Sequence, residues 1–336
     1  PNVVALFGPN AAGKSNVLRA IAFGAWFVTK SFQHPPNQDL PYEKFGSKEK
    51  IGERTRLSFS FSGPVDFLDT TGNGVMCPYS YELILSPRAN SHDRVILERL
   101  SFQPKGNGKP TTIVERREGH KVKSVRGFLT SSSENALNEI LRPQASLIST
   151  LAQLNHKVAS AFVNSINAVV SNIFIDRVEG NEVEMTRWYS SNPEALGELQ
   201  AIARRIDLGI EDITVDKSTS EPHLLFKHSG LDQIIPLHRE SHGTRMFINV
   251  FPYIFMALKR GSTAIIDELD TAIHPLILPE MLRWFGDKAR NPLGAQLWTT
   301  CHSASLLSEL TKEEVLFCEK NFQGYTSIYR LADVDR

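Results

Sequence analysis

The segment GPNAAGKSN, residues 8–16, constrains the fold of this chain more than any other stretch. It follows a short apolar run, residues 3–7, and precedes a segment at about residues 15–32 whose apolar residues recur at helical spacing. Its pattern, G-x-x-x-x-G-K-[ST], is that of a phosphate-binding loop, in which glycines let backbone N–H groups turn toward phosphate oxygens. The expected nucleotide contacts are Gly8, Pro9, Asn10, Ala11, Ala12, Gly13, Lys14, Ser15 and Asn16.

Two side chains of this loop have specific expected roles. Lys14 is expected to bridge the β- and γ-phosphates of ATP, and the Ser15 hydroxyl to ligate Mg²⁺. The helix that begins near Ser15 adds the positive end of its dipole to the same place. The sequence therefore predicts ATP and Mg²⁺ as the bound groups.

Polar residues end two further apolar strands. In TAIIDELD, residues 263–270, Asp267 is expected to hold Mg²⁺ and Glu268 to polarise the attacking water as a general base. His302 follows the apolar run 296–300 and is expected to hydrogen-bond the γ-phosphate as a second catalytic residue. A lone histidine is more often a satisfied core residue, but its place at a third strand end favours the catalytic interpretation. His274 is expected only to enter a helix.

The last hundred residues alternate between helix and strand, which indicates a mainly parallel sheet flanked by helices. The predicted helices cover residues 244–259 and 275–289, with a short helix after His302. The predicted strands are residues 263–266, 296–300 and 315–318. Because the phosphate loop lies near residue 8 and most of the sheet lies here, the middle of the chain is expected to be an insertion into one α/β domain.

The middle of the chain changes character near residue 130. Before it, residues 56–115 read as antiparallel strands; after it, apolar spacing predicts one long helix over residues 151–173 and another over 193–205, followed by short strands between 213 and 237. We therefore expect three parts: residues 1–129 as the first part of an ATPase head with a β-rich subdomain, 130–210 as a helical insert, and 211–336 as the second part of the head.

The polar segment RESHGTR, residues 239–245, leads into a long apolar helix. Ser241 and Gly243 lie at the helix entry, where free N–H groups form a second candidate site for an anion. Taken alone, the segment is better explained by Ser241 as a simple helix cap.

The order of these motifs resembles that of the ABC-type ATPase head. Ser241 and Gly243 match the L-S-G-G-Q signature of that superfamily, whereas Glu240, His242 and Thr244 depart from it. The chain is more similar to ABC-like AAA-family ATPases of bacterial antiphage defence operons, such as the ATPase subunits of PARIS-type and Septu-type systems. The shared residues are Asn16, Ser241, Gly243, Thr244, Arg245, Asp267, Glu268, Asp270, His274 and Pro275.

The resemblance implies a shared site. Ser241 and Gly243 of one copy would cap the ATP held by another, and Asp270 would face the dimer interface. The chain would then act as a homodimer or higher homo-oligomer that controls a separate effector protein, a nuclease or toxin. A glutamine that links the metal to the inserted lobe is also implied, but Gln33 and Gln38 are poorly placed for that role.

Other functions compete with this interpretation. A DNA-repair ATPase of the structural-maintenance type would usually carry long heptad arms or a C-x-x-C hook, and this sequence has neither. A transporter motor is disfavoured by Glu240, and a monomeric kinase would not need Ser241 and Gly243. A basic run at residues 115–126 is a candidate nucleic-acid contact, although a solvated strand pair is the favoured explanation.

Composition adds little to these motifs. Acidic and basic residues balance at 37 each, so total charge indicates no polyanionic partner. No apolar run of about 18 residues predicts a membrane span. The three cysteines are far apart and fit a reducing cytoplasm better than a disulfide framework. Further sequence upstream is expected, because the first strand starts at once.

Overall fold

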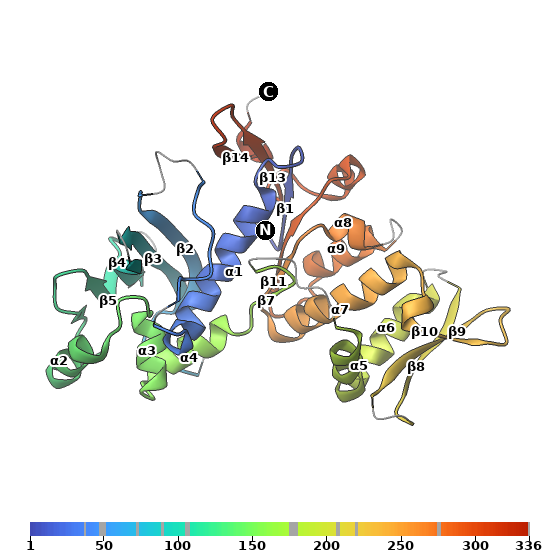
Figure 1. Ribbon diagram of the computed structural model, residues 1–336, viewed down its shortest axis with the longest axis horizontal. Coiled ribbons are helices and arrows are strands. Elements are labelled where there is room, and N and C mark those ends of the chain that lie inside the picture. The colour runs from blue at the N-terminus through green and yellow to red at the C-terminus, as the bar shows by residue number, and fades with distance from the viewer. Residues whose placement is uncertain are drawn as a thin grey trace. The chain divides into compact units, whose positions relative to one another are not determined.

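The computed structural model describes residues 1–36, 38–46, 52–71, 74–88, 91–104, 108–174, 181–205, 209–218, 221–273 and 277–334. The chain forms two compact units (Figure 1). The first unit holds residues 1–19 and 168–336, and the second holds the continuous segment 20–167. This division falls inside the expected helical segment 130–210, so its two halves belong to different units.

A six-stranded sheet forms the centre of the first unit. Five strands run parallel: β13 (Val315–Lys320), β1 (Val3–Phe7), β12 (Gln296–Thr300), β11 (Thr263–Ile266) and β7 (Val170–Ser171), in that spatial order. The edge strand β14 (Thr326–Arg330) pairs antiparallel with β13. All five residues of β1 are buried, as expected for an inner strand of a parallel sheet. The predicted mainly parallel α/β sheet is confirmed.

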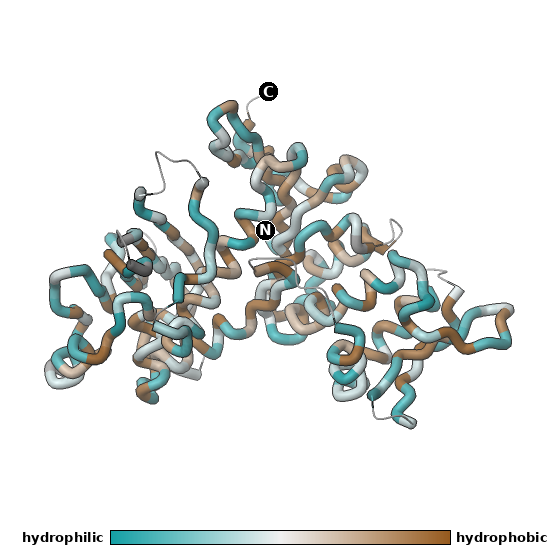
Figure 2. Tube along the Cα trace, in the orientation of Figure 1, coloured by the Kyte–Doolittle hydropathy of each residue, from teal (hydrophilic) through white to brown (hydrophobic). Residues whose placement is uncertain are grey.

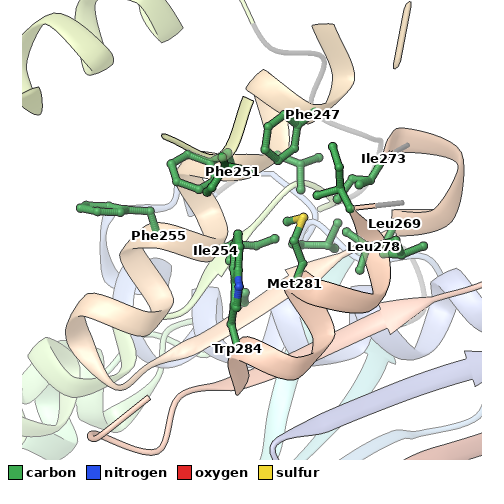
Figure 3. Packing of buried hydrophobic residues seen from close by; sticks show 14 of the residues in the cluster. Phe247, Phe251, Ile254, Phe255, Leu269, Ile273, Leu278, Met281 and Trp284 are labelled. Atoms are coloured by element: carbon green, nitrogen blue, oxygen red, sulfur yellow. The ribbon is translucent and has the colours of Figure 1, made fainter. Parts of the chain in front are cut away.

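Helices α7 (His242–Arg260) and α9 (Leu278–Gly286) pack on this sheet, α7 against β11 and α9 against β1. Phe247, Phe251 and Phe255 of α7 recur at four-residue spacing and form one face of a large cluster with Met281 and Trp284 of α9 (Figure 3). The alternation of hydrophilic and hydrophobic residues along α7 can be followed in Figure 2. This amphipathic pattern explains why the sequence predicts α7 well.

Pro252 lies inside α7 and cannot donate the usual helical hydrogen bond to the carbonyl of Ile248. The hydroxyl of Tyr189 replaces that donor, at 2.8 Å from the Ile248 oxygen. Tyr189 belongs to α5 (Glu182–Ser191) and is fully buried, so this contact joins two helices inside the core.

A small antiparallel sheet completes the first unit. It consists of β8 (Ile210–Asp216), β9 (His223–His228) and β10 (Ile234–Pro236), in the order β10, β9, β8. Helix α5 packs on β9, and α6 (Pro193–Arg205) packs on β8, as Figure 1 shows. β10 leads directly toward the start of α7.

The second unit is built on an antiparallel sheet with the strand order β2 to β6. Its strands are β2 (Thr55–Pro64), β3 (Met76–Arg88), β4 (Ser91–Phe102), β5 (Thr111–Arg117) and β6 (Lys123–Ser124). The later part of α1 (Lys14–Lys30) and the helices α2 (Ser131–Ile140), α3 (Leu147–Gln153) and α4 (Lys157–Ile166) belong to the same unit.

A buried carboxylate joins this sheet to α3. Glu98 of β4 accepts hydrogen bonds from the Tyr81 hydroxyl, the Ser146 hydroxyl and the Leu147 N–H, all between 2.7 and 2.9 Å. The basic run at residues 115–126 includes the end of β5 and all of β6, which pair with each other, as the strand-pair interpretation of this run predicts. Arg116 donates to the carbonyls of Arg142 and Ala145, so its guanidinium is used inside the chain.

The prediction of one long helix over residues 151–173 is wrong. The chain breaks between α3 and α4, where Asn155 has a φ of 59° and His156 caps α4 by accepting from the Ala159 N–H. Leu151 and Val158 enter the same core cluster, so the apolar spacing continues across the break and conceals it.

Two other helices differ from their predicted bounds. α9 covers only Leu278–Gly286, and the residues after His302 form a 3-10 helix at Ala304–Glu309. His274 and Pro275 lie outside the described residues. Within the described part of the chain, no helix combines the length and apolarity that crossing a membrane requires.

Candidate nucleotide-binding site

The loop between β1 and α1 has the backbone that a phosphate cradle needs. Gly8, Ala11 and Gly13 have φ angles of 145°, 61° and 96°, in a region where glycine is favoured. α1 begins at Lys14, and the Asn16 N–H already donates to the Gly13 carbonyl at 3.1 Å. The residues predicted from the G-x-x-x-x-G-K-[ST] pattern therefore form a strand-to-helix turn at the carboxyl edge of the sheet.

Strands β13 and β14 press against this loop. A Cβ atom on Gly8 would lie 2.2 Å from the Cys318 carbonyl oxygen, and one on Gly13 would lie 2.3 Å from the Thr326 hydroxyl. Thr326 also donates to the Ala12 carbonyl at 2.9 Å. Neither glycine can be replaced without moving these neighbours.

Lys14 is held inside the loop. Its side chain is buried, and the ammonium donates to the carbonyls of Gly8 and Pro9 at 2.8 and 3.1 Å. An ammonium has three N–H donors. The loop carbonyls fix its position and leave one donor to direct at a phosphate oxygen.

Ser15 and Asp267 meet although they are far apart in the sequence. The Ser15 hydroxyl lies 3.0 and 3.1 Å from the two carboxylate oxygens of Asp267, which follows β11. Thr300, the last residue of β12, donates to Oδ1 of Asp267 at 2.7 Å. From the other side, the Asn172 side chain accepts from the Asp267 N–H at 2.8 Å. Ser15 and Thr300 thus hold the carboxylate of Asp267 and Asn172 holds its backbone, and the residue is only 7 % exposed.

These donors fit Mg²⁺. A hydroxyl and a carboxylate are the hard oxygen ligands that this ion prefers, and it usually binds through one or two carboxylates together with substrate phosphates. Adjacent ligands of an octahedral Mg²⁺ lie about 2.9 Å apart if the bonds are about 2.0–2.1 Å. The Ser15 hydroxyl donates a hydrogen bond to the Asp267 carboxylate at 3.0 Å, so the two candidate ligand oxygens already lie side by side.

Glu268 has an unusual backbone conformation. Its φ and ψ are 52° and 50°, the left-handed region, which costs an ordinary L-residue about 1–2 kcal/mol. Its N–H donates to the Thr300 hydroxyl at 2.7 Å, and its carbonyl accepts from the Thr271 hydroxyl at 2.9 Å. Such strain persists only where the surroundings hold it, and it concentrates at functional positions.

His302 lies beside Glu268. The two side chains are about one third exposed, and Nε2 of His302 is 3.9 Å from Oε1 of Glu268. His302 is therefore not a satisfied core histidine. The structure brings both predicted catalytic side chains to the edge of the sheet that also carries the phosphate loop.

Asp270 makes contacts within its own chain. One carboxylate oxygen accepts from the N–H groups of His302 and Ser303 at 2.6 and 2.5 Å. The carboxylate thus anchors the segment that follows β12. Its expected role at a second copy stays a prediction.

Ser241 caps α7, as its simpler interpretation predicts. Its hydroxyl accepts from the Thr244 N–H at 3.1 Å, and its side chain is exposed. The preceding residue, Glu240, is buried and accepts from Nε2 of His228 on β9 at 2.6 Å. A Cβ atom on Gly243 would meet nothing within 4 Å. The start of α7 is therefore attached to β9 through Glu240, while Ser241 and Gly243 leave room for a ligand or a second chain.

Two buried thiols lie beside the loop. Burial raises the pKa of Cys301, an effect that Asp270 increases and Lys14 opposes. Burial also raises the pKa of Cys318. Both thiols stay protonated at neutral pH, so neither is a candidate nucleophile.

A protein-family model described as "AAA domain, putative AbiEii toxin, Type IV TA system" matches residues 3–308. The chain belongs to this family. It is thus an ATPase domain of the AAA type, and the fold and the phosphate loop agree with that assignment. No curated protein matches this chain.

Solved structures also resemble this AAA domain. One is described as "Crystal structure of the SmcHead bound to the C-winged helix domain of ScpA"; it is 12% identical, with a TM-score of 0.46. The alignment covers 98% of this chain and 90% of that one.

Three residues of the AAA domain's site are absent from the sequence-based prediction: Asn172, Thr300 and Thr326. Thr300 stands two residues before His302, so its place at a strand end was a usable signal. Asn172 directly follows β7 and Thr326 begins β14, and neither strand carries a motif. Gln33 and Gln38, the poor candidates for the metal-linking glutamine, belong to the second unit.

Proposed function

We propose that this chain is a cytoplasmic ATPase that binds ATP with Mg²⁺ at a site completed by a second copy. Its nucleotide cycle would control a separate toxic effector, a nuclease or toxin, in antiphage defence. The observation that carries the proposal is the meeting of Ser15, Asp267, Glu268 and His302 at one sheet edge, together with the exposed Ser241 at the start of α7. The family description, which names a toxin and a toxin–antitoxin system, supports the second part.

The direction of α7 supports a site shared between copies. α7 leads into β11 and packs along it, so its first turn points toward the carboxyl edge of the sheet. Phe247, near the start of α7, accordingly lies at the end of the cluster that holds Leu269 and Ile273 (Figure 3). Two copies related by a two-fold axis at this edge would each present Ser241 to the other, since such an interface is self-complementary.

In this proposal the chemistry is divided among five side chains. Lys14 would hold the β- and γ-phosphates, and Ser15 and Asp267 would hold Mg²⁺, which neutralises charge on the phosphate oxygens when bound. Glu268 would orient the attacking water and take its proton, which is typically worth 10²–10⁴ in rate. His302 would donate to the γ-phosphate from beside Glu268.

The catalytic part is tested with Glu268→Gln. Because the phosphate and metal contacts remain, ATP affinity should stay within about threefold while turnover falls by about 10²–10⁴. Equilibrium binding and steady-state phosphate release measure the two effects. Turnover at the native rate would contradict the assignment.

The shared site is tested by mixing Ser241→Arg with Lys14→Ala. Each variant alone should be inactive, since one lacks a cap and the other a phosphate ligand. In a two-fold dimer the mixed species has one intact site, so an equal mixture should recover about a quarter of wild-type turnover. No recovery, or full activity of isolated Ser241→Arg monomers, would show that each chain completes its own site.

The effector is tested by expressing the chain with its neighbouring gene. Growth arrest that depends on both genes, and that Glu268→Gln alters, is the expected result. Turnover that is stimulated by double-stranded DNA without any partner protein would instead favour a DNA-clamping ATPase.

A further inference from the structure

Thr300 occupies a position that links the two acidic residues of the site. It is the last residue of β12 and is 1% exposed. Since Ile266 of β11 pairs with Thr299, Thr300 lies opposite Asp267, directly beyond the end of β11. No motif in the sequence assigns it a role.

The hydrogen bonds of Thr300 have only one possible direction. A carboxylate accepts and an amide N–H donates, so the single hydroxyl hydrogen goes to Asp267 and a lone pair takes the Glu268 N–H. Both distances are 2.7 Å. One oxygen atom therefore joins the side chain of Asp267 to the backbone of Glu268.

The opposite side of the turn has a different attachment. Asn172 of the β7 end pairs with the backbone of Asp267, accepting from its N–H at 2.8 Å and donating to its carbonyl at 3.4 Å. Asn172 thus fixes the position of the Asp267 backbone. Thr300 connects the Asp267 carboxylate with the left-handed peptide of Glu268.

We propose that Thr300 is a positioning residue that transmits the placement of the Asp267 carboxylate to the general base Glu268. This rests on the proposed function. The Thr300 hydroxyl donates to the Asp267 carboxylate and accepts from the Glu268 N–H, so that N–H points toward β12. The side chain of Glu268 then points outward, beside His302. Thr300 is 1 % exposed, so it acts through Glu268 and not directly on the reacting groups.

The test compares Thr300→Val with Thr300→Ser. Valine keeps the shape and removes both hydrogen bonds, whereas serine keeps the hydroxyl. For Thr300→Val we expect kcat to fall by about 10- to 100-fold, since small displacements of a catalytic group have effects of this size. ATP affinity should change less than threefold, and Thr300→Ser should keep most of the turnover. Equal losses in the two variants, or an unchanged kcat in Thr300→Val, would overturn the proposal.

A double variant separates positioning from a general structural effect. In the Glu268→Gln background the base is already absent, so adding Thr300→Val should not lower the residual turnover further. A second loss of the same size would show that Thr300 acts by another route, and the proposal would fail.

Hydrogen exchange supplies a readout that does not require turnover. The Glu268 amide should be protected in the wild type and in Thr300→Ser, and should exchange faster in Thr300→Val. If the wild type proves unable to hydrolyse ATP, the proposed function fails, yet this comparison still decides whether Thr300 holds the Glu268 peptide. Identical exchange in all three proteins would refute that.

Discussion

Glycine is required at two positions of the phosphate loop, and the same two reasons apply at each. Gly8 and Gly13 both have positive φ angles, and both lack space for a side chain because β13 and β14 stand against them. Ala11 also has a positive φ but carries a methyl group, so its conformation alone does not exclude an L-residue. The close approach of Thr326 to Gly13 is therefore the more restrictive condition.

At the residue scale, Gly13→Ala should weaken ATP binding by at least about tenfold. The new Cβ would meet the Thr326 hydroxyl at 2.3 Å, so the loop must shift and its N–H groups lose their alignment. The matched control is Gly197→Ala in α6, where nothing lies within 4 Å of the new atom. It should bind ATP normally and melt no lower than the wild type, because alanine favours a helix by about 1 kcal/mol over glycine. Equilibrium titration with ATP measures both, and native affinity in Gly13→Ala would contradict the packing argument.

At the scale of elements, α7 illustrates how a helix tolerates an internal proline. Pro252 leaves the Ile248 carbonyl without its helical donor, and the buried hydroxyl of Tyr189 takes over that task. A buried carbonyl without a partner costs about 1–3 kcal/mol. The contact therefore matters for the stability of the first unit, which carries α7 and Ser241.

This contact can be measured with a double-variant cycle. Tyr189→Phe should lower the free energy of unfolding by about 1–3 kcal/mol, since the Ile248 carbonyl is left unpaired. In a Pro252→Ala background the helical N–H is restored, so the same change should cost clearly less. Urea unfolding of the four proteins gives the coupling energy. Equal costs in both backgrounds would mean that the hydroxyl does not replace the helical donor.

The sequence predicts the buried strands and the motif residues. It does not predict which residues of other strands lie beside those motifs. β1, β11 and β12 are confirmed at their predicted residues because inner parallel strands are continuous apolar runs. The polar residues that follow them meet at one edge because the carboxyl ends of parallel strands lie at the same edge of the sheet. Which strands lie beside the loop depends on register and crossover. Short motifs do not encode these, so they do not predict the contacts of Thr326 and Asn172.

The error at residues 151–173 has a related cause. Apolar spacing records which face is buried and does not record whether the axis is continuous. α3 and α4 turn their apolar faces to one cluster, so the pattern continues across the break at Asn155. The break depends on a left-handed residue and a histidine cap, which are weak signals in a sequence.

At the scale of the whole molecule, the three cysteines report on the two units separately. Cys77 lies in the second unit, and Cys301 and Cys318 lie in the first; all three are buried. Burial raises the pKa of each thiol, so at pH 8 the reactive thiolate fraction is smaller than in a free cysteine. The native chain should therefore react slowly with a thiol reagent, and all three cysteines should become reactive only when the chain unfolds.

ATP should protect the two units unequally. Since only the first unit carries the phosphate loop, ATP at 100 times its Kd should stabilise it by about 2.7 kcal/mol. In moderate urea, modification of Cys301 and Cys318 should slow markedly, and that of Cys77 should slow less. Peptide mass mapping after a labelling pulse distinguishes the sites. Equal protection of Cys77 would contradict a ligand effect centred on the first unit.

The position of β1 in its sheet bears on how the chain is made in the cell. β1 lies between β12 and β13, so its partners leave the ribosome only after residue 296 has been added. At synthesis rates of about 5–20 residues per second, this apolar strand waits roughly 15–60 s for them. Residues 20–167 are contiguous and can collapse in the meantime. A nascent strand of this kind is a natural client for a chaperone, and translation speed should influence the yield of active protein.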